Sequence, residues 1–294
     1  MTFENPFALE GQWLKGNLHT HTTLSDGELP PQERAAAYEA QGYDFLALTD
    51  HDRLADVQGL ATDNMLLLAG IEVVGSNPLR GPGYHIVGIN LPPEFRLPAA
   101  KDAQALIYAL KDAGALVNVA HPYWCGLTIK DLEILRDYLA IEVFNTTCEV
   151  TIGKGTSSVH WDDLLALRRR VFAVAVDDTH AITRDAYRGW VMAKCKTRSK
   201  EGVVEALANG RFYSTCGPII SAMQAEGNRV SVATSPVARI NFICSGASGR
   251  QVVGQDGRPI TSAEHTLGGS ELYVRVECTD AAGRTAWTNP VFLR

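Results

Sequence analysis

The sequence predicts an α/β protein, a parallel sheet or barrel followed by a smaller β-rich part. From Asn17 to about Ser214, short apolar runs typical of strands alternate with helical patterns. Beyond Pro218 the helical periodicity disappears, and short strand patterns are separated by Gly, Ser, Asn and Asp turns. A chain of 294 residues can bury a large core. We therefore expect a main domain over 1–217 and a β-sandwich-like domain over 218–294.

The first helix–strand unit can be traced residue by residue. Pro30 and Pro31 suit the start of a helix, and the run PQERAAAYEAQ after them consists mostly of good helix formers. Gly42 is placed to end this helix. The run DFLALTD that follows has the composition of a buried strand.

Later segments repeat this pattern. The predicted helix–strand pairs are 102–114 with 115–121, 129–139 with 140–145, and 161–170 with 171–178. A last helix is expected from Ser199 as N-cap to Gly210 as its stop. The β-rich part shows strand patterns at 229–234, 238–245 and 271–280.

Composition narrows the classes of function and location. The net charge of −6 gives little electrostatic support to nucleic-acid or anionic-membrane binding. The six cysteines are far apart and form no C-x-x-C pair, which indicates buried thiols in a reducing compartment. The chain shows neither a signal-peptide pattern at its start nor a long apolar run, so we expect a soluble, cytoplasmic protein without membrane contact.

Histidines and carboxylates recur at the ends of the strand-like runs. Because residues two apart in a strand point to the same side, His19 can act together with His21, and Asp178 with His180. Collecting such groups in an apolar interior is costly unless a cation satisfies them. The candidate metal ligands are His19, His21, Asp26, His51, Glu72, His85, His121, Asp178 and His180.

Other polar residues have more than one interpretation. Asp50 either takes part in the chemistry or accepts a hydrogen bond that orients a ligand histidine. Glu142 and Asn145 are expected to be structural or to orient ligands rather than bind metal. His160 and His265 lie outside the pattern and are expected to be structural. A His and carboxylate site accepts Mn, Zn or Fe, so the identity of the metal stays open.

The motifs NLHTHTTLSDGELPPQE, ALTDHD, GIEV, AHP and DDTH, in this order, resemble those of the PHP (polymerase and histidinol phosphatase) superfamily of metal-dependent phosphoesterases. The resemblance covers about the first 215 residues. The run GVVEALANGRFYSTCGP and the β-rich tail resemble the carbamate-hydrolysing CehA branch. The superfamily resemblance implies a distorted (β/α)7 barrel that holds two or three divalent metal ions at the carboxyl ends of its strands.

The resemblance also assigns ligands. The first metal would take His19, His21, Glu72 and Asp178; the second would share Glu72 and add His85 and His121; the third would take Asp26, His51 and His180. A hydroxide bridging two of these metals would be the nucleophile. Asp50 and His180 are the candidates for protonating the leaving group.

Positions near the motifs suggest contacts with substrate. Tyr123 and Trp124 follow the His121 motif, and three cations follow the last motif: Arg184, Arg188 and Lys194. Each of these cations can instead be a solvated surface charge.

The expected function is hydrolysis of phosphate mono- or diesters of small molecules. An alternative on the same metal centre is a carbamate or carboxylic ester hydrolase, and a further alternative is a non-catalytic metal-bearing or carbohydrate-binding scaffold. Nucleic acid is expected only as a nucleotide or short oligonucleotide substrate, because the chain is not basic and carries no polymerase-sized extension.

Overall fold

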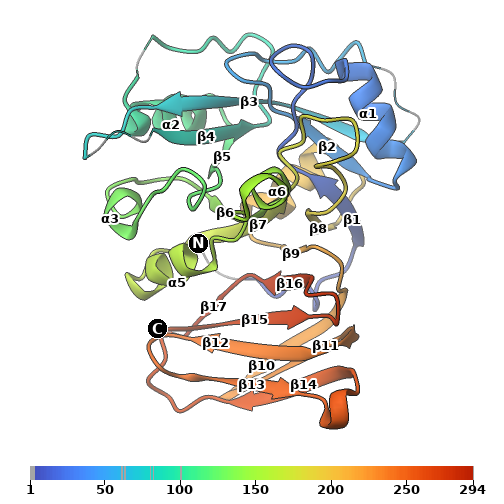
Figure 1. Cartoon of the computed structure of the whole chain (residues 1–294), viewed down its shortest axis with the longest axis vertical. Coiled ribbons are helices and arrows are strands. Elements are labelled where there is room, and N and C mark those ends of the chain that lie inside the picture. Colours follow the sequence, from blue (N-terminus) through green and yellow to red (C-terminus); the bar gives the residue numbers. More distant parts are fainter. Residues whose placement is uncertain are drawn as a thin grey trace.

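The main part of the chain is built around a mixed sheet (Figure 1). The computed structural model describes residues 4–60, 62, 64–79, 81, 83–99 and 101–293. The strands of this part are β1 (Gln12–Asn17), β2 (Phe45–Leu48), β3 (Leu66–Gly75), β4 (Tyr84–Ile89), β5 (Leu116–Val119), β6 (Ala140–Asn145), β7 (Phe172–Val176), β8 (Trp190–Cys195) and β9 (Phe212–Thr215).

Strand direction differs from the expected parallel arrangement at two places. Strands β1, β2 and β3 are parallel to one another, and so are β5, β6 and β7. Strand β4 runs antiparallel between β3 and β5, and β8 runs antiparallel to β1. The link between β3 and β4 is short, and its described residues form no crossover helix, so the two strands pair as a hairpin.

The helices are α1 (Pro31–Ala40), α2 (Ala103–Asp112), α3 (Ile129–Leu132), α4 (Thr146–Ile152), α5 (Ser158–Ala166) and α6 (Lys200–Ala208). The helix predicted over 129–139 is wrong beyond Leu132: the Arg136 guanidinium instead donates to nearby carbonyls, and Asp137 adopts a φ of 65°, which an α-helix cannot continue. The helix predicted over 161–170 starts earlier and ends at Ala166, before Arg168 takes a φ of 60°.

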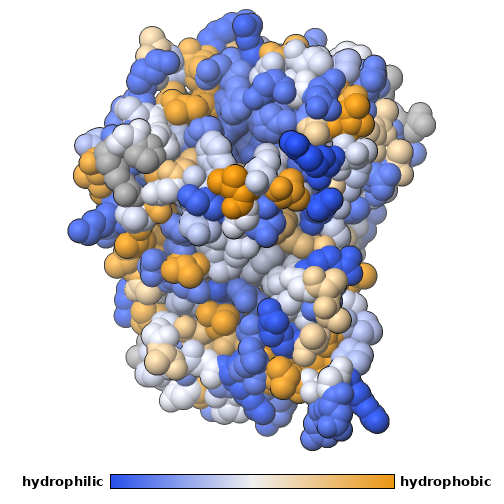
Figure 2. Space-filling view, in the orientation of Figure 1, coloured by the Kyte–Doolittle hydropathy of each residue, from blue (hydrophilic) through white to orange (hydrophobic). Residues whose placement is uncertain are grey.

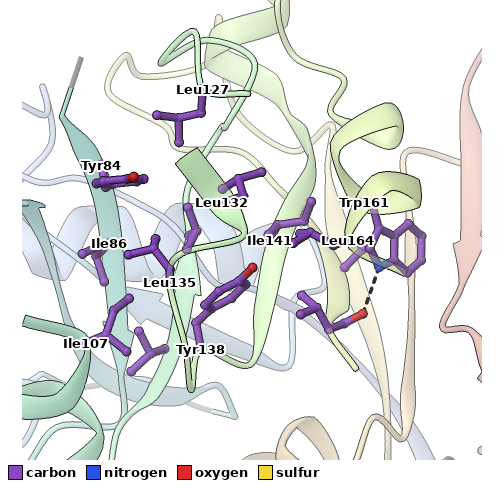
Figure 3. Close-up of a cluster of buried hydrophobic side chains, with 14 of the residues drawn as sticks. Tyr84, Ile86, Ile107, Leu127, Leu132, Leu135, Tyr138, Ile141, Trp161 and Leu164 are labelled. Atoms are coloured by element: carbon purple, nitrogen blue, oxygen red, sulfur yellow. Dashed lines mark hydrogen bonds between the residues drawn. The ribbon is translucent and has the colours of Figure 1, made fainter. Parts of the chain in front are cut away.

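Helices α2, α3 and α5 cover a core that is built largely from strands β3 to β7 (Figure 3). Tyr84, Ile107 and Ile141 are fully buried there. Trp161 is also fully buried, and its indole N–H donates to the carbonyl of Val171 at 2.9 Å. This bond satisfies the polar atom of the largest side chain in the core.

The C-terminal part contains two sheets that share a core. Strands β10 (Ile220–Glu226), β11 (Arg229–Val237) and β14 (Ile260–Thr266) form one sheet. The other contains β12 (Arg239–Cys244), β13 (Gly249–Val253), β15 (Tyr273–Thr279), β16 (Thr285–Thr288) and β17 (Val291–Phe292), with a 3-10 turn at Gln255–Gly257 before β14. Strand β16 pairs with β9, so one sheet continues across the predicted domain boundary.

Most large apolar side chains are buried, and the face shown in Figure 2 carries hydrophobic residues in small groups among hydrophilic ones. All six cysteines are buried free thiols, as the sequence indicated. Among the helices that the structure describes, none has the length and apolar character needed to cross a bilayer.

Candidate metal centre

The sheet gathers the predicted ligands at one edge. His19 and Asp178 each follow the end of a parallel strand by two residues, and His121 does the same after β5. His85 lies near the start of β4, yet reaches the same edge because this strand is antiparallel: it pairs with Val74 near the end of β3. All nine predicted ligands belong to adjoining groups of possible donor atoms.

The deepest group contains four buried side chains. His19 Nε2 lies 3.2 Å from an oxygen of Glu72 and 3.2 Å from Asp178 Oδ1. His21 Nε2 lies 3.3 Å and 3.0 Å from the same two carboxylates. The two imidazole Nε2 atoms are 3.1 Å apart. Four atoms that could bind a metal, one from each side chain, therefore face a single point.

Glu72 links this group to a second one. Its Oε1 lies 2.7 Å from His85 Nδ1 and 3.3 Å from His121 Nε2, while its Oε2 faces His19 and His21. One carboxylate thus presents one oxygen to each group. This is the arrangement that a carboxylate bridging two cations requires.

A third group lies nearer the surface. Asp26 places its oxygens 3.6 Å from His21 Nδ1, 3.6 Å from His51 Nε2 and 3.5 Å from His180 Nε2. Asp26 is 54% exposed, whereas His21 is fully buried. His21 therefore faces the deep group with one ring nitrogen and the outer group with the other.

Glu142 orients the deep group from behind. It accepts a hydrogen bond from His19 Nδ1 at 2.6 Å, one from the backbone N–H of His121 at 2.9 Å, and one from Asn145 at 2.8 Å. Asn145 also donates to Asp178 at 3.0 Å. Because His19 donates from Nδ1, its neutral form, which is the one that binds metal, presents the lone pair of Nε2 toward the other ligands.

These residues fit divalent cations. Asp178 Oδ1 is buried without a hydrogen-bond partner although His21 Nε2 is close by. Lone pairs of His19 and two carboxylates also converge there, a costly arrangement unless a cation or proton lies between them. His121 and Asp178 adopt φ values of 29° and 57°, a backbone strain that is typical of functional sites.

The carboxylates also control the charge of the histidines. Burial opposes protonation of His21, but contacts with Asp178 and Glu72 outweigh it and raise its pKa to about 9. Burial likewise opposes protonation of His19, whose pKa the same carboxylates and Glu142 raise well above its usual value. At the more open His51, burial prevails and lowers the pKa. Metal binding at the deep group therefore has to displace protons.

Asp50 lies behind the ligands rather than among them. It is fully buried and accepts hydrogen bonds from the backbone and hydroxyl groups of Thr22 and Ser25, at 2.7 to 3.2 Å. These four bonds hold the turn that leads to Asp26. Asp185, which the sequence analysis did not single out, holds the opposite loop by accepting from the backbone N–H of His180 at 3.0 Å.

Arg34 is a further residue that the sequence analysis missed. This fully buried residue of α1 donates to the carbonyls of His21 at 3.0 Å, His180 at 3.0 Å and Ala181 at 2.9 Å. It joins the loop of His21 and Asp26 to the loop of His180, which are two of the three segments that carry the outer group. The sequence signal that could have identified Arg34 was its position on the buried side of a predicted helix.

A cavity of about 470 Å³ opens over the ligands. Its other walls include Trp124, Ile152 and Arg184. Of the predicted substrate contacts, only Arg184 and Trp124 line this cavity. Tyr123 lies under the ammonium of Lys154, Lys194 lies over the ring of Trp13, and Arg188 faces a different cavity. His160 and His265 lie outside the ligand groups that the described residues form.

The sheet brings the motifs to one edge, which is the arrangement that their resemblance to the PHP superfamily implies. A two-domain protein from Bacteroides vulgatus, described as containing a predicted PHP-like metal-dependent phosphoesterase, has the same overall fold. The TM-score is 0.53 and the sequence identity 17%, over 95% of this chain and 93% of that one. This likeness supports the PHP-like fold that the motifs led us to expect.

Two characterised proteins share shorter segments. A 5'-3' exoribonuclease of Haemophilus influenzae is 40% identical over 80 residues, which are 26% of this chain and 28% of that protein. The DNA polymerase/3'-5' exonuclease PolX of Bacillus subtilis is 40% identical over 53 residues, 18% of this chain and 9% of that protein. The matches thus span about a quarter and about a tenth of these relatives. A search of protein-family models finds no match.

Proposed function

We propose that this chain is a metal-dependent hydrolase of phosphate mono- or diesters of small molecules, with residues 1–217 as the hydrolase domain. The observation that carries the proposal is Glu72, which presents one oxygen to each of two ligand groups on the floor of a cavity. Two or three divalent cations at these groups would supply Lewis acidity and an activated water at neutral pH.

The residues of the chain have distinct proposed roles. Arg184 is placed to bind phosphoryl oxygens, and Trp124 and Ile152 offer apolar walls to the leaving group. When only the two groups that share Glu72 hold cations, His180, 27% exposed, carries no metal and is the proposed proton donor to the leaving oxygen. For Asp50 we propose the positioning role rather than the acid, since its carboxylate accepts four hydrogen bonds from Thr22 and Ser25.

The test combines elemental analysis with hydrolysis assays before and after chelation. The substrates are p-nitrophenyl phosphate, bis-p-nitrophenyl phosphate, an aryl carbamate and a short RNA. We expect bound metal and chelator-sensitive turnover of an aryl phosphate. His121→Ala should lose this turnover, and His160→Ala, outside the ligand groups, should retain it.

The same assays separate the competing functions. Turnover of the carbamate alone would support the ester hydrolase and the CehA-type branch. Preference for the RNA would point to an oligonucleotide substrate, in line with the exoribonuclease relative. Bound metal without turnover of any substrate would favour the non-catalytic scaffold.

A further inference from the structure

A second cavity, of about 760 Å³, lies between α4 and the β15–β16 turn of the C-terminal part. We call it the inter-domain cleft. Its volume falls within the range of roughly 300 to 1,000 Å³ that is usual for small-molecule sites. No candidate metal ligand lines it. The cleft is therefore separate from the metal cavity.

The charged residues of the cleft favour an anion. Of the two acids in the lining, Glu277 is paired with Arg275, and Glu149 accepts a hydrogen bond from the backbone N–H of Gly155 at 3.1 Å. Arg284 is oriented by Asp280, with Nε donating at 2.8 Å. Three arginines therefore face two glutamates in the cleft. The remaining cations, Arg188 and Arg239, are exposed, and their side chains make no ion pair with any residue that the structure describes. Both guanidinium groups are thus available to a phosphate or carboxylate.

Aromatic side chains form the other part of the lining. Phe144 and Trp287 are stacked, with ring centroids 6.1 Å apart and an interplanar angle of 25°. Tyr187 and Trp190 add two more rings from the main domain. Aromatic faces beside free guanidinium groups suit a ligand that combines a planar ring with a negative charge.

The cleft also shares its walls with the metal cavity. Helix α4 lines the cleft with Glu149 and Val150 and the metal cavity with Thr151 and Ile152. The 184–188 segment lines both cavities as well. An occupant of the cleft therefore contacts the same elements that shape the metal cavity.

We propose that the inter-domain cleft is a second binding site for an aromatic anion of the size of a nucleoside monophosphate, and that its occupancy changes the affinity of the metal cavity for substrate. The coupling, though not the site, rests on the proposed function. Arg188, which follows the last ligand motif, belongs to this second site.

Binding is tested by titration calorimetry on the metal-loaded chain with the methylenephosphonate analogue of adenosine monophosphate, whose P–C bond resists hydrolysis. The double variant Arg188→Ala/Arg239→Ala should weaken one binding step at least ~10-fold. Arg250→Ala, an exposed arginine outside the cleft, is the matched control. Binding of the analogue in the cleft should persist after the metals are chelated and in the Arg184→Ala variant, because neither the metals nor Arg184 belongs to the cleft.

Each outcome is decisive. Unchanged binding in the double variant, or loss of all binding in Arg184→Ala, would overturn the cleft site. Adenosine alone and inorganic phosphate alone should each bind more weakly than the analogue, and equal binding of either would refute the combined recognition. Binding in the cleft without any change in the KM for p-nitrophenyl phosphate would overturn the coupling and leave the site. A lack of phosphatase activity would refute the proposed function and, with it, the coupling, but it would leave the cleft site.

Discussion

At the scale of single residues, the site depends on side chains that hold ligands as much as on the ligands. Glu142 fixes His19 through Nδ1 and His121 through its backbone, and Asn145 reaches both Glu142 and Asp178. Glu142 and Asn145 therefore set the charge and the orientation of the ligands in the deep group, from the side away from the other ligands. Hydrogen-bond partners of this kind typically contribute 10- to 100-fold to metal affinity.

Glu142→Gln should reduce metal affinity by about 10- to 100-fold while preserving the fold, because the amide keeps the shape but loses the charge that stabilises the His19 N–H. Metal titration with a chromophoric chelator measures the effect. Glu133→Gln, an exposed glutamate on α3's C-terminal side, is the control and should bind metal as the parent does. Equal affinity in Glu142→Gln would show that Glu142 is only structural.

At the scale of elements, local patterns predicted the ligand-bearing strands and several helices. Ser199 caps α6 as expected, accepting a hydrogen bond from the N–H of Gly202 at 3.1 Å. The extent of α3 was not predictable in this way, because Arg136 is a good helix former and the hydrogen bonds of its guanidinium, together with the φ of Asp137, end the helix instead. The direction of β4 was missed for a similar reason, since pairing joins distant residues.

The placement of charged side chains was the least predictable part of the site. Arg184 and Arg188 lie four residues apart in one loop and line different cavities. Tyr187 between them adopts a φ of 65°, and Asp177 accepts hydrogen bonds from the backbone N–H groups of Tyr187 and Arg188. The chain therefore turns back within this loop, and proximity to a motif did not indicate which cavity a side chain faces.

The cap of α6 gives a prediction for an isolated element. Ser199→Ala should lower the free energy of unfolding by about 1 kcal/mol, because the Gly202 N–H loses its acceptor. Denaturant unfolding measures this change. Ser248→Ala, at an exposed position of the C-terminal part, should leave stability unchanged within ~0.5 kcal/mol.

Helix α1 gives a second prediction, because Arg34 connects it to the loops of His21 and His180. Arg34→Met keeps an apolar stem and removes the three donors, so we expect a loss of about 3 kcal/mol of stability and weaker metal binding. Thermal unfolding with and without metal measures both effects. Glu33→Gln, exposed on the same helix, is the control. Unaltered stability and metal binding in Arg34→Met would contradict the role assigned to Arg34.

At the scale of the whole molecule, two features join the main and C-terminal parts. Strand β16 extends the sheet through β9, and Arg275 of β15 pairs with Asp162 of α5 through two bonds of 2.7 Å. Arg275 is almost fully buried and lies over the ring of Trp161, at 4.7 Å. The ion pair therefore fastens the C-terminal part to a helix that packs on the core of the main part.

Breaking this pair tests whether the two parts fold as one unit. Arg275→Ala leaves Asp162 without its main partner and removes the cation from the Trp161 ring, so we expect a loss of about 3 to 5 kcal/mol. Asp162→Asn/Arg275→Met, which removes both charges of this pair, should recover part of that loss, because Glu277 is then the only partner of Arg275 left with an unpaired charge. Denaturant unfolding followed by tryptophan fluorescence and by circular dichroism gives the measurement. One shared transition in the parent that separates into two in Arg275→Ala would show that the pair couples the parts. A single transition at unchanged denaturant concentration would assign the coupling to the β9–β16 ladder instead.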